Sequence, residues 1–181
     1  AMAAHAWVLG HTAVIRAAAP DGRQGEVLAY LPLGARLRPL VAPHTRTKRQ
    51  RHGLPVEMAD GRRGVVKVSD VGVVRPGRSA ERIGSAAAAH ALALRGATYL
   101  WGGTSSWGVD CSGLVQLAYV LAGIALPRDA QDQIRVARRL RPGETARAGD
   151  LLFFARNSEV NHVAMVTSPA RFVHAYGKVE E

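Results

Sequence analysis

The composition of the chain changes sharply before Glu81, and this change most limits what the chain can fold into. The first 75 residues hold short β-rich runs such as AVIRA and EVLAYLPLG, separated by Gly, Pro and Asp. Short β-rich runs separated by such turn residues are typical of a small all-β barrel or sandwich. From Glu81 the sequence ERIGSAAAAHALALR is rich in Ala and Leu, which favour a helix. The 181 residues therefore predict two domains, over 1–78 and 79–181, with a linker at Arg75–Ser79.

The second domain is predicted to contain helices first and strands afterwards. Helices are expected over residues 81–95, 112–122 and 129–140, because a glycine or a Pro-Gly pair ends each of these segments. Three apolar runs follow between turn residues, DLLFFA, HVAMVT and RFVHA, and they predict an antiparallel sheet. Helices followed by strands indicate the α+β class.

The net charge of +10 is unevenly distributed along the chain. Residues 1–80 carry 13 Lys and Arg against 5 Asp and Glu, whereas residues 81–181 carry 11 against 9. Because 21 of the 24 basic residues are Arg and Ala is frequent, the basic character reflects coding bias as much as an anionic partner. The basic segment His44–His52 is interpreted as a solvated loop, with contact to an anionic polymer as the alternative. We expect no nucleic-acid partner.

The single cysteine, Cys111, excludes an intramolecular disulfide. No apolar run reaches the length of a membrane span. The start of the chain, AMAAHAWVLG, lacks the basic and long apolar regions of an intact signal peptide. The compartment therefore stays open between the cytoplasm and export with removal of a signal peptide.

The stretch TYLWGGTSSWGVDCSGLV, residues 98–115, carries the candidate chemistry. A loop rich in Gly and small polar residues leads to Cys111 and then directly into an apolar helix. Unpaired backbone N–H groups and the positive end of the helix dipole favour a thiolate at such a position. Since a free cysteine titrates near ~8.5, this placement can supply a nucleophile at neutral pH. The alternative interpretation is that Cys111 is a small buried side chain of the core.

Two histidines lie on predicted neighbouring strands, His162 at the start of HVAMVT and His174 in RFVHA. If residues 167–169 form the turn, the hairpin is centred on its middle residue, and His162 then faces His174 directly. Directly opposed side chains have Cβ atoms about 5 Å apart. We therefore predict a line of nucleophile, general base and orienting group made by Cys111, His162 and His174.

Other types of site are disfavoured by the residues present. A zinc site made by His162, His174 and Asp150 would lack both an HExxH motif and a second cysteine, so we expect no metal. The glycines before Cys111 are not followed by Gly-Lys-Ser or Gly-Lys-Thr, which argues against a phosphate-binding loop. A set of aromatic side chains is interpreted as packing groups rather than ligand-stacking groups: Trp101, Trp107, Phe153 and Phe154.

The second domain resembles the NlpC/P60 cell-wall cysteine peptidases. The phrases TYLWGG, GVDCSGLV, LPRDAQDQ, GDLLFF, VNHVAMV and FVHA follow one another as in that family over residues 81–177. The resemblance implies a papain-like α+β fold in which Cys111 is the nucleophile, His162 the base and His174 the residue that orients the base. It also implies that Tyr99 lies near the oxyanion.

The same resemblance implies a set of substrate contacts and a missing strand. The residues that fall where relatives contact substrate are Asp110, Ser112 and Asp129, and Asp129 is expected to meet a free peptide amine. Relatives usually have at least one more strand after the position of His174, whereas this chain stops at Glu181. We therefore expect either a truncated sheet or a last strand that is supplied differently.

Residues 5–75 resemble, through less specific phrases, a bacterial SH3-like domain. The phrase ADGRRGVVKVSDV is similar to the hairpin and final short strand of such domains, and EVLAYLPLGARLRPL is similar to their middle. The resemblance implies a papain-like catalytic domain preceded by a small all-β SH3-like barrel, as in relatives in which the barrel limits the substrate to short stem peptides.

The function that the resemblance implies is hydrolysis of murein stem peptides without a cofactor. The scissile bond would join γ-D-Glu to a diamino acid, diaminopimelate or Lys, in L-Ala-γ-D-Glu-diamino acid, and cleavage would pass through a thioester. Such a peptidase would act in murein recycling or in the wall itself. The alternatives are an N-acetylmuramoyl-L-alanine amidase on the same fold and a non-catalytic protein that binds the cell wall or another anionic polymer.

Overall fold

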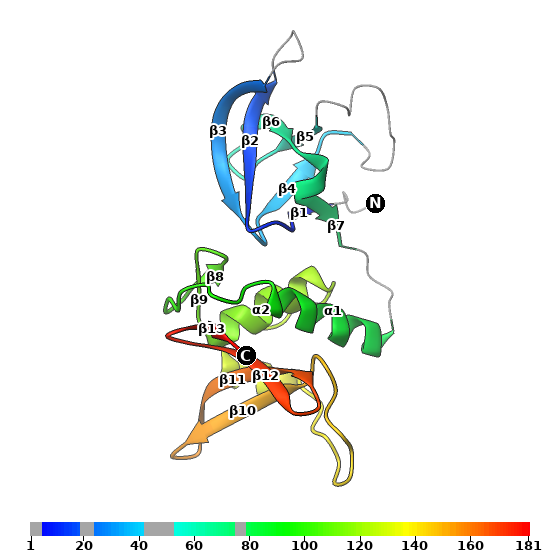
Figure 1. Ribbon diagram of the computed structural model, residues 1–181, viewed down its shortest axis with the longest axis vertical. Coiled ribbons are helices and arrows are strands. Elements are labelled where there is room, and N and C mark those ends of the chain that lie inside the picture. The colour runs from blue at the N-terminus through cyan, green and yellow to red at the C-terminus, as the bar shows by residue number, and fades with distance from the viewer. Residues whose placement is uncertain (1–4, 19–23, 42–52, 75–78) are drawn as a thin grey trace. The chain divides into compact units, whose positions relative to one another are not determined.

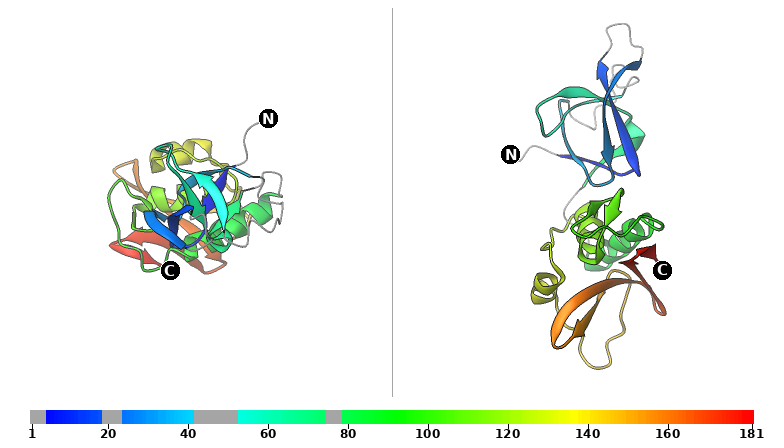
Figure 2. Two further views of the ribbon diagram at one scale, coloured as in Figure 1. Left: turned by 90° about the horizontal axis from the view of Figure 1, so that it is seen from above. Right: turned by 90° about the vertical axis from the view of Figure 1, so that its left-hand side faces the viewer.

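The chain divides into two compact units, Ala1–Val74 and Arg75–Glu181, in a computed structural model (Figures 1 and 2). The structure describes residues 5–18, 24–41, 53–74 and 79–181. The basic segment His44–His52 and most of the predicted linker lie outside the described residues. Over the described part of the chain, no helix is both long enough and apolar enough to cross a membrane.

Antiparallel strands and a short 3-10 helix at Val68–Asp70 make up the described residues of the first unit. In chain order the strands are β1 (Ala6–Val8), β2 (Thr12–Ala18), β3 (Gln24–Pro32), β4 (Arg36–Pro39), β5 (Leu54–Glu57), β6 (Arg63–Val66) and β7 (Val71–Val73). They form one sheet in the order β3-β2-β6-β5-β4-β1-β7. Because side chains alternate between the faces of a strand, Ala13 and Ile15 of β2 enter the same core as Leu54 and Val56 of β5. The predicted β character is therefore confirmed for the described residues of this unit.

The second unit combines helices with a four-stranded sheet. Its elements are α1 (Ala80–Leu92), β8 (Thr104–Ser105), β9 (Gly108–Val109), α2 (Cys111–Leu121), α3 (Ala130–Val136), β10 (Leu151–Arg156), β11 (Glu159–Ser168), β12 (Arg171–Tyr176) and β13 (Lys178–Glu180). The strands of the larger sheet lie in the order β10-β11-β12-β13. Helices α1 and α2 pack against each other and against β11 and β12, as Figure 1 shows. This arrangement confirms the α+β class.

The core of the second unit lies between α2 and the middle of the sheet. Leu114 and Val115 of α2 are fully buried, as are Val163 and Met165 of β11. The next residues of β11 are buried on its other face as well, which explains the nearly continuous apolar run VAMV. The core therefore fixes the start of α2 relative to the strands that carry the two histidines.

Helix α3 is shorter than the sequence predicted. It ends at Val136 instead of residue 140, and Ala137 is already extended, with a ψ angle of 140°. Beyond it, Glu144 accepts hydrogen bonds from the side chain of Arg138 and from the backbone N–H of Arg141, both at 2.8 Å. These bonds close a loop, and that loop replaces the last predicted turn of the helix.

The predicted register of the β11–β12 hairpin is wrong. Met165 pairs with Val173, so the hairpin is centred one residue later than expected, with Pro169 and Ala170 in the turn. The fixed φ of proline suits the first corner of a turn, and its missing N–H cannot join the ladder. His162 and His174 are consequently not directly opposed, but lie on the same face as diagonal neighbours.

Strand β13 was not predicted. It pairs with β12 through the register His174–Glu180, Ala175–Val179 and Tyr176–Lys178. Its inner residue, Val179, is buried, and its backbone exchanges hydrogen bonds with Gly96 and Ala97 after α1. The expectation of a truncated sheet or of a last strand supplied differently is therefore wrong, because the chain itself supplies a strand after His174 at the edge of β12.

Candidate active site

Cys111 is the first residue of α2, as the sequence predicted within one residue. Asp110 caps the helix, and its Oδ1 accepts a hydrogen bond of 2.7 Å from the backbone N–H of Gly113. A side chain added at Gly113 would come within 2.1 Å of the carbonyl oxygen of Gly103, so the helix start and the glycine-rich loop approach each other closely. Cys111 itself is 8% exposed and forms no disulfide.

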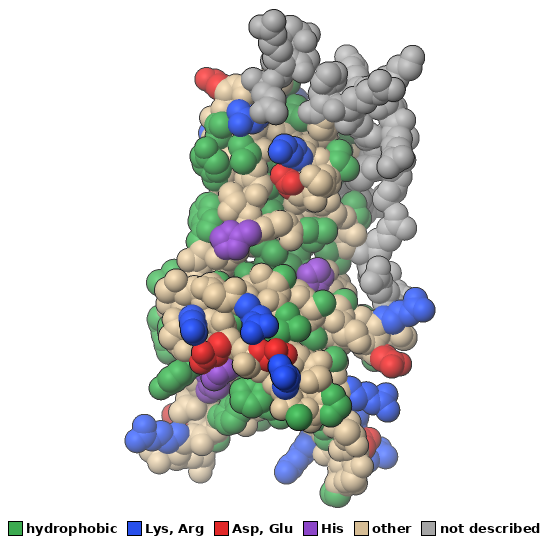
Figure 3. All heavy atoms as spheres, viewed as in Figure 1, with side chains coloured by type: hydrophobic (Ala, Val, Ile, Leu, Met, Phe, Trp, Pro, Cys, Tyr) green, Lys and Arg blue, Asp and Glu red, His purple; other side chains and the backbone are tan. Residues whose placement is uncertain are grey.

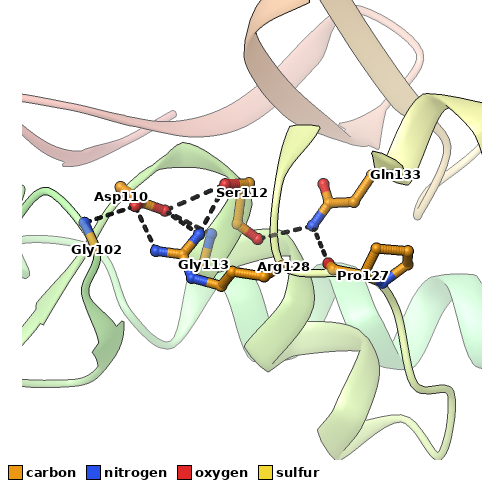
Figure 4. A network of polar contacts seen from close by, with 7 residues as sticks. All are labelled: Gly102, Asp110, Ser112, Gly113, Pro127, Arg128 and Gln133. Carbon is orange, nitrogen blue, oxygen red and sulfur yellow. Dashed lines mark hydrogen bonds and ion pairs between the residues drawn. The ribbon is translucent and has the colours of Figure 1, made fainter. Parts of the chain in front are cut away.

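A buried polar network holds this helix start to the segment before α3 (Figure 4). Arg128 binds both carboxylate oxygens of Asp110 and also donates to Ser112 Oγ at 2.9 Å. The N–H of Gly102 donates to Asp110 as well, at 2.8 Å. Burial alone would raise the pKa of Asp110, but the hydrogen bonds from Arg128, Gly113 and Gly102 outweigh it and lower that pKa. The carboxylate therefore stays ionised and neutralises Arg128.

Gln133, which the sequence did not single out, belongs to the same network. Its side chain is 1% exposed, and its Nε2 donates to the carbonyl oxygens of Ser112 and Pro127, both at 3.0 Å. It thereby joins the first turn of α2 to the segment that leads into α3, as Figure 4 shows. A polar residue on the inward face of a predicted helix was the signal that could have identified it.

Cys111 lines a cavity of about 550 Å³, a volume in the usual range for small-molecule and peptide sites. The wall is formed by Tyr99, Trp101, Gly102, Asp110, Cys111, Ser112, Arg128, Asp129, Ala130, Gln131, Glu159, Val160 and Asn161. Asp129 occupies the N-cap position of α3, but its side chain makes no capping bond. Because Asp110 neutralises Arg128, the carboxylates of Asp129 and Glu159 give the cavity an acidic character.

The two predicted histidines meet in the sheet. His162 Nε2 lies 3.0 Å from His174 Nδ1, a hydrogen-bond distance, and the two rings are nearly perpendicular. Phe154 and Tyr176 pack against the ring of His162. Burial is the main cause that lowers the pKa of His162, and the charge of His174 lowers it further. His162 is therefore neutral near pH 7, which is the form that accepts a proton.

Tyr99 lies at the cavity wall and keeps its hydroxyl proton. Burial raises the pKa of Tyr99, and the nearby Cys111 and Asp110 raise it further, against the opposing effect of Arg128. A protonated hydroxyl close to Cys111 is suited to donating a hydrogen bond to a developing oxyanion.

The cavity thus gathers five of the residues that the sequence singled out, namely Tyr99, Asp110, Cys111, Ser112 and Asp129. Sequence reasoning missed Glu159 and Asn161 as residues of the cavity wall, although Asn161 belongs to the phrase VNHVAMV. The interpretation of Trp101 as a packing group is wrong, because Trp101 is 86% exposed at the cavity. Within the described residues, no group of three His, Cys, Asp or Glu side chains is placed to hold a metal ion.

The class of site follows from this geometry. A thiol begins a helix and lines a cavity, and a hydrogen-bonded histidine pair occupies the strands against which that helix packs. A thiol at a helix start and a histidine pair on the strands packed against that helix are groups that a cysteine peptidase uses, although neither histidine belongs to the cavity wall. Residues 96–181 match the model of the NlpC/P60 family, which is a family of cysteine peptidases.

Individual relatives are consistent with this assignment. A γ-D-glutamyl-L-lysine dipeptidyl-peptidase from Bacillus subtilis is 37% identical over 83 residues, which are 44% of this chain and 28% of the relative. A probable endopeptidase NlpC homologue from Haemophilus influenzae is 36% identical over 104 residues, 56% of this chain and 55% of the relative. The chain therefore spans between about a quarter and about half of these relatives.

Among solved structures, an NlpC/P60 family protein from Bacillus cereus shares the fold with a TM-score of 0.77. It is 23% identical, and the likeness covers 98% of this chain and 57% of the other. The likeness therefore extends over residues of both units and concerns the fold alone.

Proposed function

We propose that the second unit is a peptidase that cleaves the bond between γ-D-Glu and a diamino acid in murein stem peptides. The observation that carries this proposal is the position of Cys111 at the start of α2, on the wall of a peptide-sized cavity. The helix start supplies backbone N–H groups and a positive potential to the thiolate. The family of the domain and the names of its relatives support hydrolysis of cell-wall peptides.

The chemistry follows from the residues at hand. His162 takes the thiol proton, and the thiolate of Cys111 attacks the amide carbonyl carbon, so that a C–S bond forms and the carbonyl electrons move to oxygen. Tyr99 and the N–H of Cys111 hold that oxyanion. The C–N bond then breaks, and His162 gives its proton to the leaving amine. Water next attacks the thioester, His162 accepts the water proton, and the thiolate leaves.

The charges of the cavity support a substrate with a free amine. Asp129 and Glu159 face the cavity, while Arg128 is occupied by Asp110. A stem peptide L-Ala-γ-D-Glu-diamino acid offers an α-ammonium group on L-Ala, and we assign it to Asp129. The B. subtilis relative is named for γ-D-glutamyl-L-lysine, in which a γ-D-glutamyl group is joined to a diamino acid.

The test is product analysis on defined peptides. The tripeptides L-Ala-γ-D-Glu-Lys and L-Ala-γ-D-Glu-diaminopimelate are incubated with the protein, and mass spectrometry follows release of the free diamino acid. We expect L-Ala-D-Glu and the diamino acid as products, and a loss of turnover by at least ~10³-fold in Cys111→Ala. An N-acetylated tripeptide, which has no amine for Asp129, should react more slowly through a higher KM.

Three results would contradict the proposal. Turnover that survives Cys111→Ala excludes the thiol as the nucleophile. Release of intact stem peptides from muropeptides, leaving free lactyl groups, would show an amidase instead. Binding to sacculi that falls steeply with salt, persists in Cys111→Ala and accompanies no cleavage would show a binding protein.

We further propose that the first unit is an SH3-like accessory module, and that the catalytic domain begins near Ser79. The single antiparallel sheet with its own core supports this, as does the short final strand β7 after the 3-10 helix. The excess of basic residues belongs to this half of the sequence. It would favour retention of the protein near anionic wall polymers without taking part in the chemistry.

A further inference from the structure

A carboxylate lies next to His174, on the side of that ring away from His162. Glu180 on β13 pairs directly with His174 on β12, and its Oε1 lies 3.8 Å from His174 Nε2. The other ring nitrogen of His174 is the one that meets His162. Three side chains on three elements of one sheet are thus aligned in the order His162, His174, Glu180. At 3.8 Å the last contact is an ion-pair distance, and one bridging water or a small side-chain rotation turns it into a hydrogen bond.

This alignment favours one arrangement of the protons on the ring nitrogens. A carboxylate can only accept, so it favours the form of neutral His174 that has its proton on Nε2. Nδ1 of His174 then carries no proton, and its lone pair accepts a hydrogen bond from the Nε2–H of His162. The proton of neutral His162 therefore lies on Nε2. Its Nδ1 carries no proton and is free to take the proton of the thiol. The opposite set of protons would block that nitrogen.

We propose that Glu180 is a positioning residue that sets the tautomers of both histidines through His174, and so prepares His162 as the base. This inference rests on the proposed function and deepens it. The role of Glu180 does not follow from Cys111, His162 and His174 alone, because the sequence indicated no partner for Nε2 of His174. The strand that supplies Glu180 was itself unexpected.

The charges around this line of residues are balanced. Lys178 Nζ lies 4.0 Å from Glu180 Oε2, on the same strand, and Tyr176 stacks parallel to His174. The next carboxylate, Glu181, accepts a hydrogen bond of 2.7 Å from Thr167 and pairs with two arginines, Arg95 and Arg171. Figure 3 shows acidic and basic side chains gathered beside a histidine on one face of the second unit. Glu180 is thus the carboxylate directed at His174, and Glu181 is directed elsewhere.

This difference provides a matched control. Glu180→Gln and Glu181→Gln remove the same charge from neighbouring positions of one strand end, but only the first alters the partner of His174. We measure kcat and KM on the tripeptide for both variants, and the ¹⁵N chemical shifts of the histidine rings by NMR. For Glu180→Gln we expect kcat to fall about tenfold with KM within about twofold, as for other groups that orient a histidine. We also expect its His174 to gain the Nδ1–H tautomer.

The two measurements separate the possible failures. If Glu180→Gln matches Glu181→Gln in kcat and in the ring ¹⁵N shifts, the positioning role is overturned. A loss of kcat without a change of tautomer also overturns it, because disturbance of β13 would explain such a loss. If the wild-type protein cleaves no stem peptide, the proposed function fails. The ring shifts, which need no substrate, still test the link between Glu180 and the tautomers.

Discussion

The surroundings of His162 favour its neutral form, which the proposed role as a base requires. Its ring is partly buried in the sheet between Phe154 and Tyr176, and its Nε2 is engaged by His174. Burial, followed by the charge of His174, lowers its pKa below the ordinary value of 6.5. The protonated form is therefore disfavoured in the folded protein, and the free base is present at neutral pH and somewhat below it.

The pH dependence of turnover tests this. Since the base must be neutral to accept the thiol proton, we expect the acid limb of kcat/KM to fall below pH 6.5, as measured on the tripeptide from pH 4.5 to 8.5. As the pH falls, His162 is protonated in the unfolded chain before it is protonated in the folded protein. The contribution of neutral His162 to the free energy of unfolding is therefore present above pH 6.5 and is lost as the pH falls through the folded pKa.

His90 on α1 is the control for that experiment. Burial lowers its pKa too, but it lies on a helix that carries no part of the site. His90→Gln should leave the acid limb in place, whereas loss of the second imidazole in His174→Gln should move the limb to higher pH. An acid limb above 6.5 in the wild-type protein would contradict this account of His162.

The start of α2 is the element on which the site depends. Its cap, Asp110, receives hydrogen bonds from Gly102, Gly113 and Arg128, which belong to the preceding loop, to the helix and to the segment before α3. Gln133 adds a second tie from α3 to the same turn. The position of Cys111 is therefore set by several segments at once, and a single change in the network should be felt both in stability and in turnover.

We expect Asp110→Ala to lower the free energy of unfolding by about 3 kcal/mol. It removes a cap and leaves Arg128 without its partner, although partial exposure of the guanidinium moderates the cost. Urea denaturation measures the change. Asp132→Ala is the matched control, because it also breaks an Asp–Arg pair in this unit. That pair is exposed and joins neighbouring turns of α3, so its loss should lower the free energy of unfolding by less than about 0.5 kcal/mol. Equal losses in the two variants would contradict the assigned role of Asp110.

At the scale of the whole molecule, each unit has its own core. The residues that fill the first core, such as Ile15 and Val56, all come from before residue 74. Those between α2 and the sheet, such as Leu114 and Met165, all come from after residue 79. Since burial of apolar surface is the main driving force for folding, the two cores can form separately.

Separate expression of residues 1–78 and 79–181 tests this division. We expect each fragment to unfold cooperatively, with a β-type far-UV circular dichroism spectrum for the first and a mixed spectrum for the second. Loss of a cooperative transition in residues 79–181 alone would show that the catalytic domain needs the first unit for its stability. The full chain, measured alongside, provides the reference.

Much of this architecture was predictable because its causes are local. The Ala-rich segment of α1, the apolar run after Cys111 and the turn residues between the strands act on their near neighbours in the chain. Helix propensity, caps and alternation are therefore visible in the sequence. The thiol at a helix start and the two histidines on adjacent strands could be identified for the same reason.

The features that were missed depend on groups brought together from distant parts of the chain. The register of the histidines was set by which corner of the turn Pro169 occupies. The exposure of Trp101 and the buried place of Gln133 depend on what packs around them.

By itself, then, the sequence determined a candidate nucleophile, the helix that begins with it and a candidate base, because these follow from short-range patterns. Only the tertiary structure decided that Arg128 is neutralised by Asp110, that Glu159 lines the cavity and that Glu180 lies behind His174. Packing and strand pairing between distant parts of the chain set the partner of a side chain. No local sequence pattern contains that information.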